Sequence, residues 1–331
     1  MRVLAVDDDP QILQTLPAVF RQARLRDIEL ANSGAAALRL LNDPDEHFDV
    51  LLLDIKMPQM DGIELCRRIR NLKRYRATPI IMLTSSAHSP RIERAFAAGA
   101  DDYLTKPFDV REIVMRVRVA ERMAKRRSKI HIIDPICLRP DVREGEHPFK
   151  NTDPLRISHV ERLILPFSLG NYLSQLSRRQ LNTCSIFSVR LMDVGLLYAS
   201  AKTHEFAYAL SMIVDGIAKV VECPRMLMAY EGEGSFLCIT QAAVPFDWPD
   251  VEYAIQDQLD AHTLPLENGW PMGLTVAVGN PVTPNASSNQ RVKRTFDRAR
   301  ERAIHREQSK GRQAIQTRHQ LHAENVEDLR A

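Results

Sequence analysis

Residues 50–58 read Val-Leu-Leu-Leu-Asp-Ile-Lys-Met-Pro, an apolar run of strand length that ends in polar groups. Three more stretches share this arrangement: Val-Asp-Asp-Asp-Pro at 6–10, Ile-Met-Leu-Thr-Ser at 81–85 and Asp-Tyr-Leu-Thr-Lys-Pro at 102–107. The carboxyl ends of parallel strands meet at one edge of an open α/β sheet, where such sheets bind ligands. The four stretches therefore predict acidic groups, a hydroxyl and a lysine at one edge, a set that can hold a divalent cation and a phosphoryl group.

Strands and helices are expected to alternate up to about residue 122. The strands are predicted at 2–6, 28–31, 50–54, 80–84 and 103–105, and the helices at 11–24, 35–42, 62–72, 89–98 and 110–123. Strands separated by helices of this length predict a doubly wound parallel sheet with right-handed connections.

Length and composition bound the class of protein. A chain of 331 residues suggests about two domains. With 45 basic and 42 acidic residues the net charge is +3, which implies no global attraction to nucleic acid or to a membrane. The 5 cysteines include no Cys-x-x-Cys pair. No apolar run approaches the roughly 18 residues of a membrane span, so we expect a soluble, cytoplasmic protein with reduced thiols and no membrane partner.

The motifs of the first 122 residues resemble the receiver domain of bacterial two-component response regulators, which has a flavodoxin-like fold. Four strings carry the resemblance: Val-Asp-Asp-Asp-Pro at 6–10, Asp-Ile-Lys-Met-Pro-Gln-Met-Asp-Gly at 54–62, Thr-Pro-Ile-Ile-Met-Leu-Thr at 78–84 and Gly-Ala-Asp-Asp-Tyr-Leu-Thr-Lys-Pro-Phe at 99–108. Their order and register span one whole domain. The resemblance implies phosphorelay signalling.

In that family the residue matching Asp54 accepts a phosphoryl group from a histidine kinase or a phosphotransfer protein. The resemblance implies a Mg²⁺ held by Asp8, Asp54 and the backbone carbonyl of Lys56, with Asp7 acting mainly through a metal-bound water. A hard cation with few protein oxygens and several waters is typical of magnesium.

The same resemblance assigns roles in the switch to three further residues. Lys106 would contact a phosphoryl oxygen, and the Thr84 hydroxyl would donate a hydrogen bond to a phosphoryl oxygen. Tyr103 would turn inward and change the surface around it. Taken singly, the residues of these motifs have simpler explanations. For example, an acidic run before a helix often serves as an N-cap. Their joint order favours the phosphoryl switch.

A phosphorylation-dependent homodimer is one of two explanations for charged residues at positions that many receivers use for a symmetric contact. They are Asp101, Asp102, Glu112, Arg116 and Arg118. Ile92 stands where that pattern usually has a basic residue. A solvated charged surface explains the same residues equally well.

The predicted domain organisation has four parts. The receiver occupies 1–124, an irregular proline-containing linker 125–156, an α+β domain 157–317 and a polar, fraying tail 318–331. In the α+β domain, strands at 225–230 and 235–240 flank Glu231-Gly232-Glu233-Gly234, which predicts a β-hairpin. A basic helix is predicted at 291–310.

The layout of the α+β domain resembles a degenerate GGDEF domain, the fold of diguanylate cyclases. Leu169-Gly170-Asn171-Tyr172, Met192-Asp193-Val194, the strand at 274–279 and Ser309-Lys310-Gly311-Arg312 are similar to its other motifs. Its signature hairpin reads Glu231-Gly232-Glu233-Gly234-Ser235-Phe236 here.

Departures from the GGDEF pattern remove metal ligands. Ser235 stands where a carboxylate is expected, and Gly195 replaces an aspartate two residues after Asp193. Too few oxygens remain for a two-metal site, so the domain is predicted to be catalytically inactive and to act by binding an unknown output protein. The alternatives are an active diguanylate cyclase making cyclic di-GMP from GTP and a DNA-binding regulator acting through the basic helix. Nucleic-acid binding is not expected, because no helix-turn-helix precedes that helix.

Overall fold

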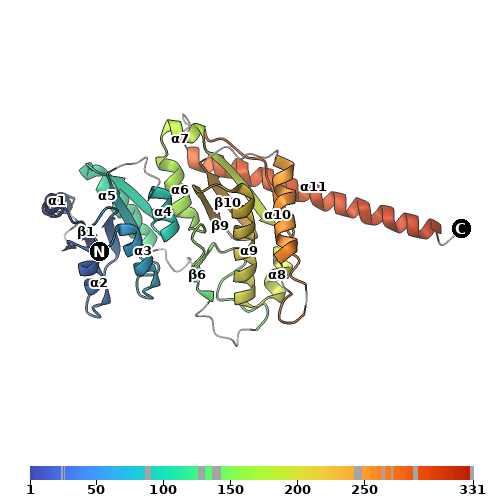
Figure 1. The fold of residues 1–331 in the computed structure, drawn as a ribbon, viewed down its shortest axis with the longest axis horizontal. Coiled ribbons are helices and arrows are strands. Elements are labelled where there is room, and N and C mark those ends of the chain that lie inside the picture. The colour runs from blue at the N-terminus through green and yellow to red at the C-terminus, as the bar shows by residue number, and fades with distance from the viewer. Residues whose placement is uncertain are drawn as a thin grey trace. The chain divides into compact units, whose positions relative to one another are not determined.

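The computed structural model describes residues 1–328 except 24, 26, 86–90, 126–130, 136–142, 242–247, 263–264, 270 and 286–289. The chain divides into two compact units. The first unit comprises Met1–Asp134 and Asp153–Gln175, and the second comprises Pro135–Thr152 and Leu176–Ala331. Figure 1 shows the fold coloured by residue number, with many of its elements labelled.

A parallel five-stranded sheet in the order β2-β1-β3-β4-β5 forms the centre of the first unit (Figure 1). Its strands are β1 (Arg2–Val6), β2 (Asp27–Ala31), β3 (Val50–Asp54), β4 (Ile80–Thr84) and β5 (Asp102–Thr105). All residues of β3 and β4 are buried, as expected for central strands covered on both faces. The predicted doubly wound parallel sheet is confirmed, and the strand bounds differ from those expected by one residue at most.

Four helices connect these strands, α1 (Pro10–Gln22), α2 (Gly34–Asn42), α3 (Gly62–Asn71) and α4 (Arg91–Ala98), and α5 (Val110–Lys125) follows β5. N-capping residues mark the starts of three of these helices. Asp9, Ser33 and Asp61 are N-caps whose side chains accept hydrogen bonds from backbone N–H groups of the first turns. The expected start of the fourth helix at residue 89 lies outside the described residues.

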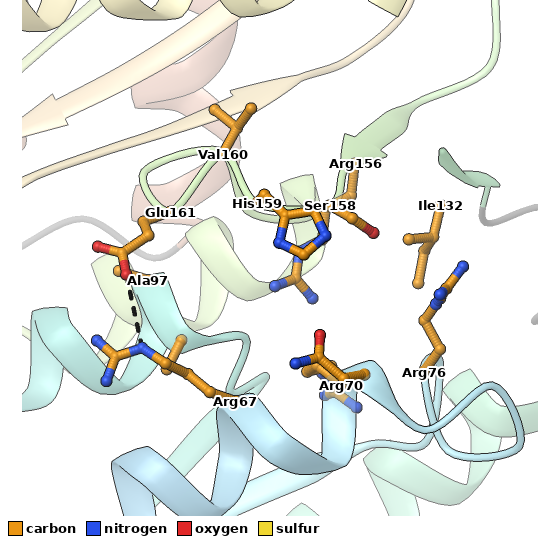
Figure 2. A pocket seen from close by; sticks show the side chains of 12 residues that line it. Arg67, Arg70, Arg76, Ala97, Ile132, Arg156, Ser158, His159, Val160 and Glu161 are labelled. Atoms are coloured by element: carbon orange, nitrogen blue, oxygen red, sulfur yellow. Dashed lines mark ion pairs between the residues drawn. The ribbon is translucent and has the colours of Figure 1, made fainter. Parts of the chain in front are cut away.

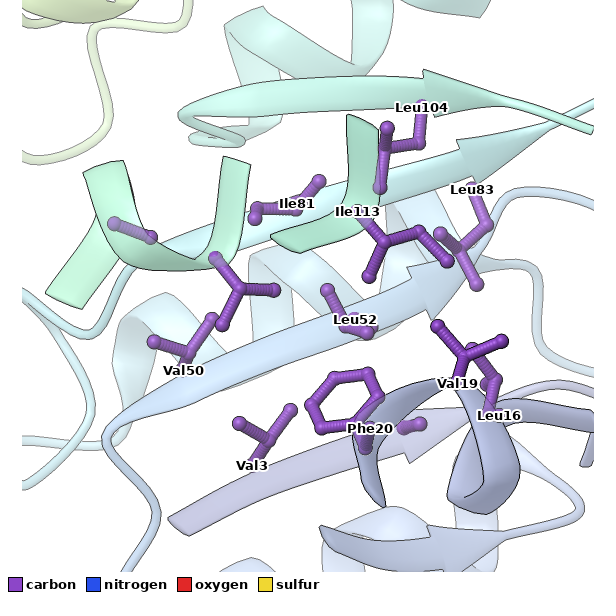
Figure 3. Packing of buried hydrophobic residues seen from close by; sticks show 13 residues of the cluster. Val3, Leu16, Val19, Phe20, Val50, Leu52, Ile81, Leu83, Leu104 and Ile113 are labelled. Carbon is purple, nitrogen blue, oxygen red and sulfur yellow. The ribbon is translucent and has the colours of Figure 1, made fainter. Parts of the chain in front are cut away.

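One hydrophobic core lies between the sheet and the two helices α1 and α5. Alternate strand residues such as Val3, Leu52 and Leu83 point to this face, where Phe20 of α1 and Ile113 of α5 pack against them (Figure 3). Phe20 is 1% exposed and Ile113 is fully buried. Burial of one such side chain contributes about 1.5–3 kcal/mol to the free energy of folding. This packing therefore stabilises the sheet whose carboxyl edge carries the polar residues.

The segment expected to be an irregular linker contains regular structure. Strand β6 (His131–Ile133) pairs in parallel with β7 (Leu155–Ile157). Leu155 and Ile157 are buried, while Arg156 between them is only partly buried. This alternation is typical of a strand, but the run is short and prolines surround it, so the sequence did not predict a strand here. The first unit continues to Gln175 and includes helix α6 (Pro166–Gln175), so the boundary expected at residue 157 lies within it.

The second unit is built on antiparallel strands in the order β11-β8-β10-β9. Its elements are α7 (Arg178–Asn182), β8 (Ser185–Leu191), α8 (Val194–Ser200), α9 (Thr203–Val221), β9 (Met226–Tyr230), β10 (Ser235–Thr240), α10 (Trp248–His262), β11 (Val276–Val278) and α11 (Arg291–Asp328). The predicted hairpin is confirmed by the pairing of β9 with β10.

Helix α11 is longer than expected. It runs through the segment predicted to fray and ends at Asp328 (Figure 1). Glutamine, alanine, arginine and leucine are good helix formers, and neither Gly nor Pro follows Gly311, so the backbone continues as a helix despite its polarity. None of the helices in the described ranges combines the length and hydropathy needed to cross a bilayer.

Candidate functional site

Three carboxylates meet at the carboxyl edge of the parallel sheet, as the sequence predicts. Asp7 follows β1, Asp54 ends β3, and one oxygen each of Asp7, Asp8 and Asp54 lies within 4.8 Å of the others. Asp7 is fully buried, Asp54 is 4% exposed, and Asp8 is open to solvent. Among the described residues this is the one such group of three acidic or metal-binding side chains.

Lys106, in the loop after β5, joins this acidic group. Its Nζ lies 2.6 Å from Asp7 Oδ2 and 2.6 Å from Asp54 Oδ1. Burial raises the pKa of Asp54, and the Lys106 ammonium opposes that rise without cancelling it. Burial acts to lower the pKa of Lys106, but the charges of the two nearby carboxylates outweigh that and raise it. The site therefore pairs a partly desolvated carboxylate with a firmly protonated amine.

The orientation of Asp54 is fixed by backbone contacts. Its Oδ2 accepts a hydrogen bond from the Lys56 backbone N–H at 2.8 Å. A Cβ on Gly62, the first residue of α3, would lie 2.0 Å from the Asp54 carbonyl oxygen. Gly62 thus lets α3 approach the end of β3, a role visible in the sequence only as the last residue of the 54–62 motif. Asp9, next to the acidic pair, caps α1 through a 2.8 Å bond from Gln11 N–H.

The group could hold a hard divalent cation. Oδ2 of Asp7 is buried and accepts no hydrogen bond of good geometry from the described residues, although Lys106 lies close. Carboxylate oxygens are the ligands that Mg²⁺ prefers, and the exposed Asp8 leaves the site open to water. The donor set therefore fits the expected magnesium.

Thr84 and Tyr103 lie where the strands place them. Thr84 ends β4 at 4% exposure, and its carbonyl accepts a 2.7 Å bond from the Lys106 backbone N–H, which ties together the ends of β4 and β5. Tyr103 of β5 is also 4% exposed and meets Phe96 of α4 edge-to-face. Burial raises the pKa of Tyr103 to about 12, so its hydroxyl keeps its proton at neutral pH. The switching roles of these residues stay predictions.

Several of the charged residues that match a dimerisation face of receivers are paired within the first unit. Asp101 bonds to Arg70 at 2.9 Å, and Asp102 bonds to Arg116 at 2.9 Å. Ile92 is 3% exposed, so it belongs to the core rather than to a charged surface. These contacts favour an internal role for Asp101 and Asp102.

Helix α6 packs on this face, a feature that the sequence did not signal. Tyr172 donates a hydrogen bond to Glu93 of α4 at 2.9 Å and packs against Phe96. Gln175 bonds to Asp102, and the Tyr103 hydroxyl contacts the Gln175 carbonyl at 3.5 Å. The surface around Tyr103 is therefore covered by a segment of the same unit.

The hairpin loop of the second unit is tied into its own fold. Glu231 accepts two hydrogen bonds from Arg300 of α11, at 2.8 and 2.6 Å. A Cβ on Gly232 would lie 2.4 Å from the Thr152 carbonyl oxygen, and the Gly234 N–H bonds to the Tyr230 hydroxyl. Glu233, Ser235 and Phe236 complete the predicted loop motif, of which Ser235 and Phe236 begin β10. Asp193 is exposed and brings no further carboxylates to a common point within the described residues.

Known proteins resemble the first unit. Residues 3–118 match the family described as response regulator receiver domain. The chain is 38% identical over 134 residues to the transcriptional regulatory protein ResD of Bacillus subtilis, covering 40% of this chain and 53% of that protein. It is 39% identical over 122 residues to the heme response regulator HssR of Staphylococcus aureus, covering 37% and 52%. The chain thus spans about half the length of these curated relatives.

Solved structures match the same region. The chemotaxis protein CheY4 of Vibrio cholerae is 32% identical, with a TM-score of 0.34, and the match covers 36% of this chain and 97% of that one. A putative response regulator from Chloroflexus aurantiacus is 36% identical, with a TM-score of 0.34 and coverage of 37% and 97%.

Proposed function

Residues 3–118 form a response regulator receiver domain, and on that premise we propose that Asp54 accepts a phosphoryl group from a histidine kinase or phosphotransfer protein. The observation that carries the proposal is the 2.6 Å contact of Asp54 with Lys106 at the acidic sheet edge. In the transfer, a phosphohistidine whose ring is protonated on its other nitrogen loses its N–P bond, a bond forms between phosphorus and an Asp54 oxygen, and the electron pair stays on the ring nitrogen, so that histidine leaves as neutral imidazole.

The chain's own residues prepare Asp54 for this step. Lys106 is a compact positive charge that can exchange its carboxylate contacts for a phosphoryl oxygen. The Lys56 N–H holds one Asp54 oxygen, which leaves the other, on the Lys106 side, as the nucleophile. A bound Mg²⁺, held by Asp8, Asp54 and the Lys56 carbonyl with Asp7 contributing through water, would neutralise negative charge between carboxylate and phosphoryl group.

The signal leaves the site through β4 and β5. Thr84 donates its hydroxyl to the phosphoryl group, and its backbone bond to Lys106 couples that movement to the end of β5. Tyr103 then shifts against Phe96 and Gln175. The consequence is a change in how α6 packs, and α6 directly precedes the longer segment of the second unit, Leu176–Ala331.

The second unit is proposed to be a non-catalytic GGDEF-like domain that acts by binding another protein. Its antiparallel strands and the β9–β10 hairpin support the resemblance. Two observations argue against a working two-metal site: the described residues gather no acidic triad there, and Glu231 is already paired with Arg300.

The two alternatives have less support. An active diguanylate cyclase needs oxygen ligands that Gly195 and Ser235 do not provide. For DNA binding, several basic residues of α11 are engaged within the unit: Arg306 and Lys310 both contact Glu252, at 2.8 and 3.1 Å. The relative named a transcriptional regulator matches over only 134 residues, about the length of the receiver.

Phosphoryl uptake tests the first proposal. The full chain is incubated with Mg²⁺ and a phosphorylated phosphotransfer protein, and phosphoryl incorporation is read by intact mass. The wild type and an Asp45→Asn control in an exposed loop should be modified, whereas Asp54→Asn should not. Equal modification of Asp54→Asn would exclude Asp54 as the acceptor.

Nucleotide turnover tests the second proposal. The full chain, with and without beryllofluoride as a mimic of the acyl phosphate, is incubated with GTP and Mg²⁺. No cyclic dinucleotide is expected in either case. Its formation would establish an enzyme and refute the non-catalytic assignment.

A further inference from the structure

A pocket of about 190 Å³ lies in the first unit between α3, α4 and the segment that contains β7. Basic side chains dominate its walls: Arg67, Arg70, Arg76, Arg156 and His159. Figure 2 shows Arg156, Arg70 and His159 directed toward one space. Asp101, which bonds to Arg70, also bonds to the first backbone N–H of β4, so the pocket lies at the amino edge of the sheet, opposite Asp54.

Three of the arginines have acidic partners. Arg70 pairs with Asp101 at 2.9 Å, and Arg76 pairs with Asp134 at 2.8 Å. At the rim, Arg67 Nε lies 3.5 Å from Glu161, the ion pair drawn in Figure 2. Each of these three arginines is neutralised by its acidic partner. The fourth arginine of the pocket is Arg156.

Arg156 has no such partner. No described residue makes a hydrogen bond or an ion pair with it, and its Nε is shielded from solvent without an acceptor. Burial, helped by the neighbouring Arg70, lowers the pKa of Arg156. A partly buried cation beside another cation is electrostatically unfavourable, and a bound anion would relieve that repulsion. The pocket therefore lacks one negative charge.

The backbone is shaped to admit this guanidinium. A Cβ at residue 99 would lie 2.7 Å from Arg156 Nη2, and Gly99 has a φ of +108° that other residues rarely adopt. The Gly99 carbonyl accepts two bonds from Arg70, at 2.9 and 2.7 Å. Gly99 thus positions Arg70 and Arg156 side by side, as a receptor for one anion requires.

We propose that this pocket binds a compact phosphorylated small molecule, with Arg156 as its principal ligand beside the ion-paired Arg70 and Arg76. The guanidinium fork matches phosphate oxygens, and the Ser158 hydroxyl and Asn71 amide at the wall add uncharged donors. A volume of about 190 Å³ is below the ~300 Å³ of typical drug-sized sites. This favours a single phosphate group on a small body over a dinucleotide.

Calorimetric titration of the full chain with inorganic phosphate tests the proposal. EDTA is present so that the Asp54 site holds no cation. The wild type should bind saturably, and Arg156→Gln should weaken binding at least tenfold. The matched control is Arg68→Gln, on the same helix α3 but paired outside the pocket with Glu64 at 2.8 Å, and it should bind like the wild type.

Thermal unfolding separates a ligand-binding Arg156 from a structural one. In phosphate-free buffer Arg156→Gln should melt at or above the wild-type temperature, because it removes an unpaired charge, and it should lose the upward shift that phosphate produces. If the glutamine variant does not fold, the arginine is structural and the proposal fails. Arg156→Lys, which keeps the charge but not the fork, should bind less tightly than the wild type.

Other results would overturn the proposal. They are no saturable binding by the wild type, equal binding by Arg156→Gln, or loss of binding in Arg298→Gln instead. The last would place the anion on α11 of the second unit, where Arg291, Arg294 and Arg298 line another hollow.

Discussion

Tyr172→Phe removes one hydroxyl from the contact between α6 and α4, and its effect measures how phosphorylation reaches α6. The hydroxyl donates to the buried Glu93 carboxylate at 2.9 Å, and Tyr172 is 1% exposed. A hydrogen bond to a charged group contributes about 1.5–3 kcal/mol. At 1.36 kcal/mol for each factor of ten, opening of α6 should become about ten to a hundred times more frequent.

Hydrogen exchange measured by mass spectrometry on peptides spanning 166–175 reads that opening directly. Backbone amides of α6 should exchange about ten to a hundred times faster in Tyr172→Phe than in the wild type. With beryllofluoride bound, the wild-type α6 should itself exchange faster, and the additional effect of the substitution should shrink. The reason is that the bond to Glu93 is then already weakened.

Tyr75→Phe is the matched control. Its hydroxyl donates to the Glu46 carbonyl at 3.2 Å, and the residue is fully buried in the first unit. Its substitution should leave exchange of 166–175 unchanged with or without beryllofluoride. If Tyr172→Phe accelerated exchange equally in both states, α6 would not respond to the phosphoryl site, and the coupling argued above would be wrong.

Three more predictions concern the sites themselves. Gly62→Ala should lower the free energy of urea unfolding of the first unit by about 1–3 kcal/mol, because its Cβ would lie 2.0 Å from the Asp54 carbonyl oxygen. The control Gly195→Ala has open space around it and should stabilise its helix by about 0.5–1 kcal/mol. Similar effects of the two substitutions would contradict the close approach at Gly62. Asp54→Asn should raise the free energy of unfolding at pH 7, since burial raises the folded-state pKa of Asp54 and the charged carboxylate destabilises the fold. This gain should vanish below the ordinary pKa of about 3.9, where the folded and the unfolded chain both hold the proton. Urea midpoints at pH 7 and below about pH 3.9 measure it, and a lower stability of Asp54→Asn at pH 7 would contradict the argument. A double-mutant cycle of Glu231→Gln and Arg300→Gln should give a coupling of about 0.5–1 kcal/mol, allowing for the solvent exposure of the arginine, and a coupling near zero would free Glu231 for another role.

The first unit was predictable to the extent that its signals were local. Apolar runs that end in Asp7, Asp54 and Thr84 specify strands whose carboxyl ends must meet, so the acidic edge follows from pattern and topology alone. Lys106 joins that edge because it follows the neighbouring strand. Gly62 carries no chemical signal of its own, and only its distance to Asp54 reveals what it does.

The contacts of 153–175 were not predictable, since they depend on pairing between distant segments. Leu155 and Ile157 offer only two apolar residues to define a strand, too few to outweigh the surrounding prolines. Nothing in the sequence distinguishes Arg156 from other basic residues, and only the structure places it beside Gly99 and Arg70. Similarly, polar composition suggested a frayed tail where α11 continues, because polarity indicates exposure but does not prevent a helix.

Chemical trapping identifies which residue carries the phosphoryl group, the role proposed for Asp54. The full chain is phosphorylated by a phosphotransfer protein with Mg²⁺ and reduced with borohydride, which converts an aspartyl phosphate to homoserine. The peptides that contain residues 7–8 and residue 54 are then sequenced by mass spectrometry. Homoserine is expected at residue 54, with intact aspartate at Asp7 and Asp8. Homoserine at either of those two residues, or an unreduced Asp54 in a chain that carries the phosphoryl group, would contradict that role.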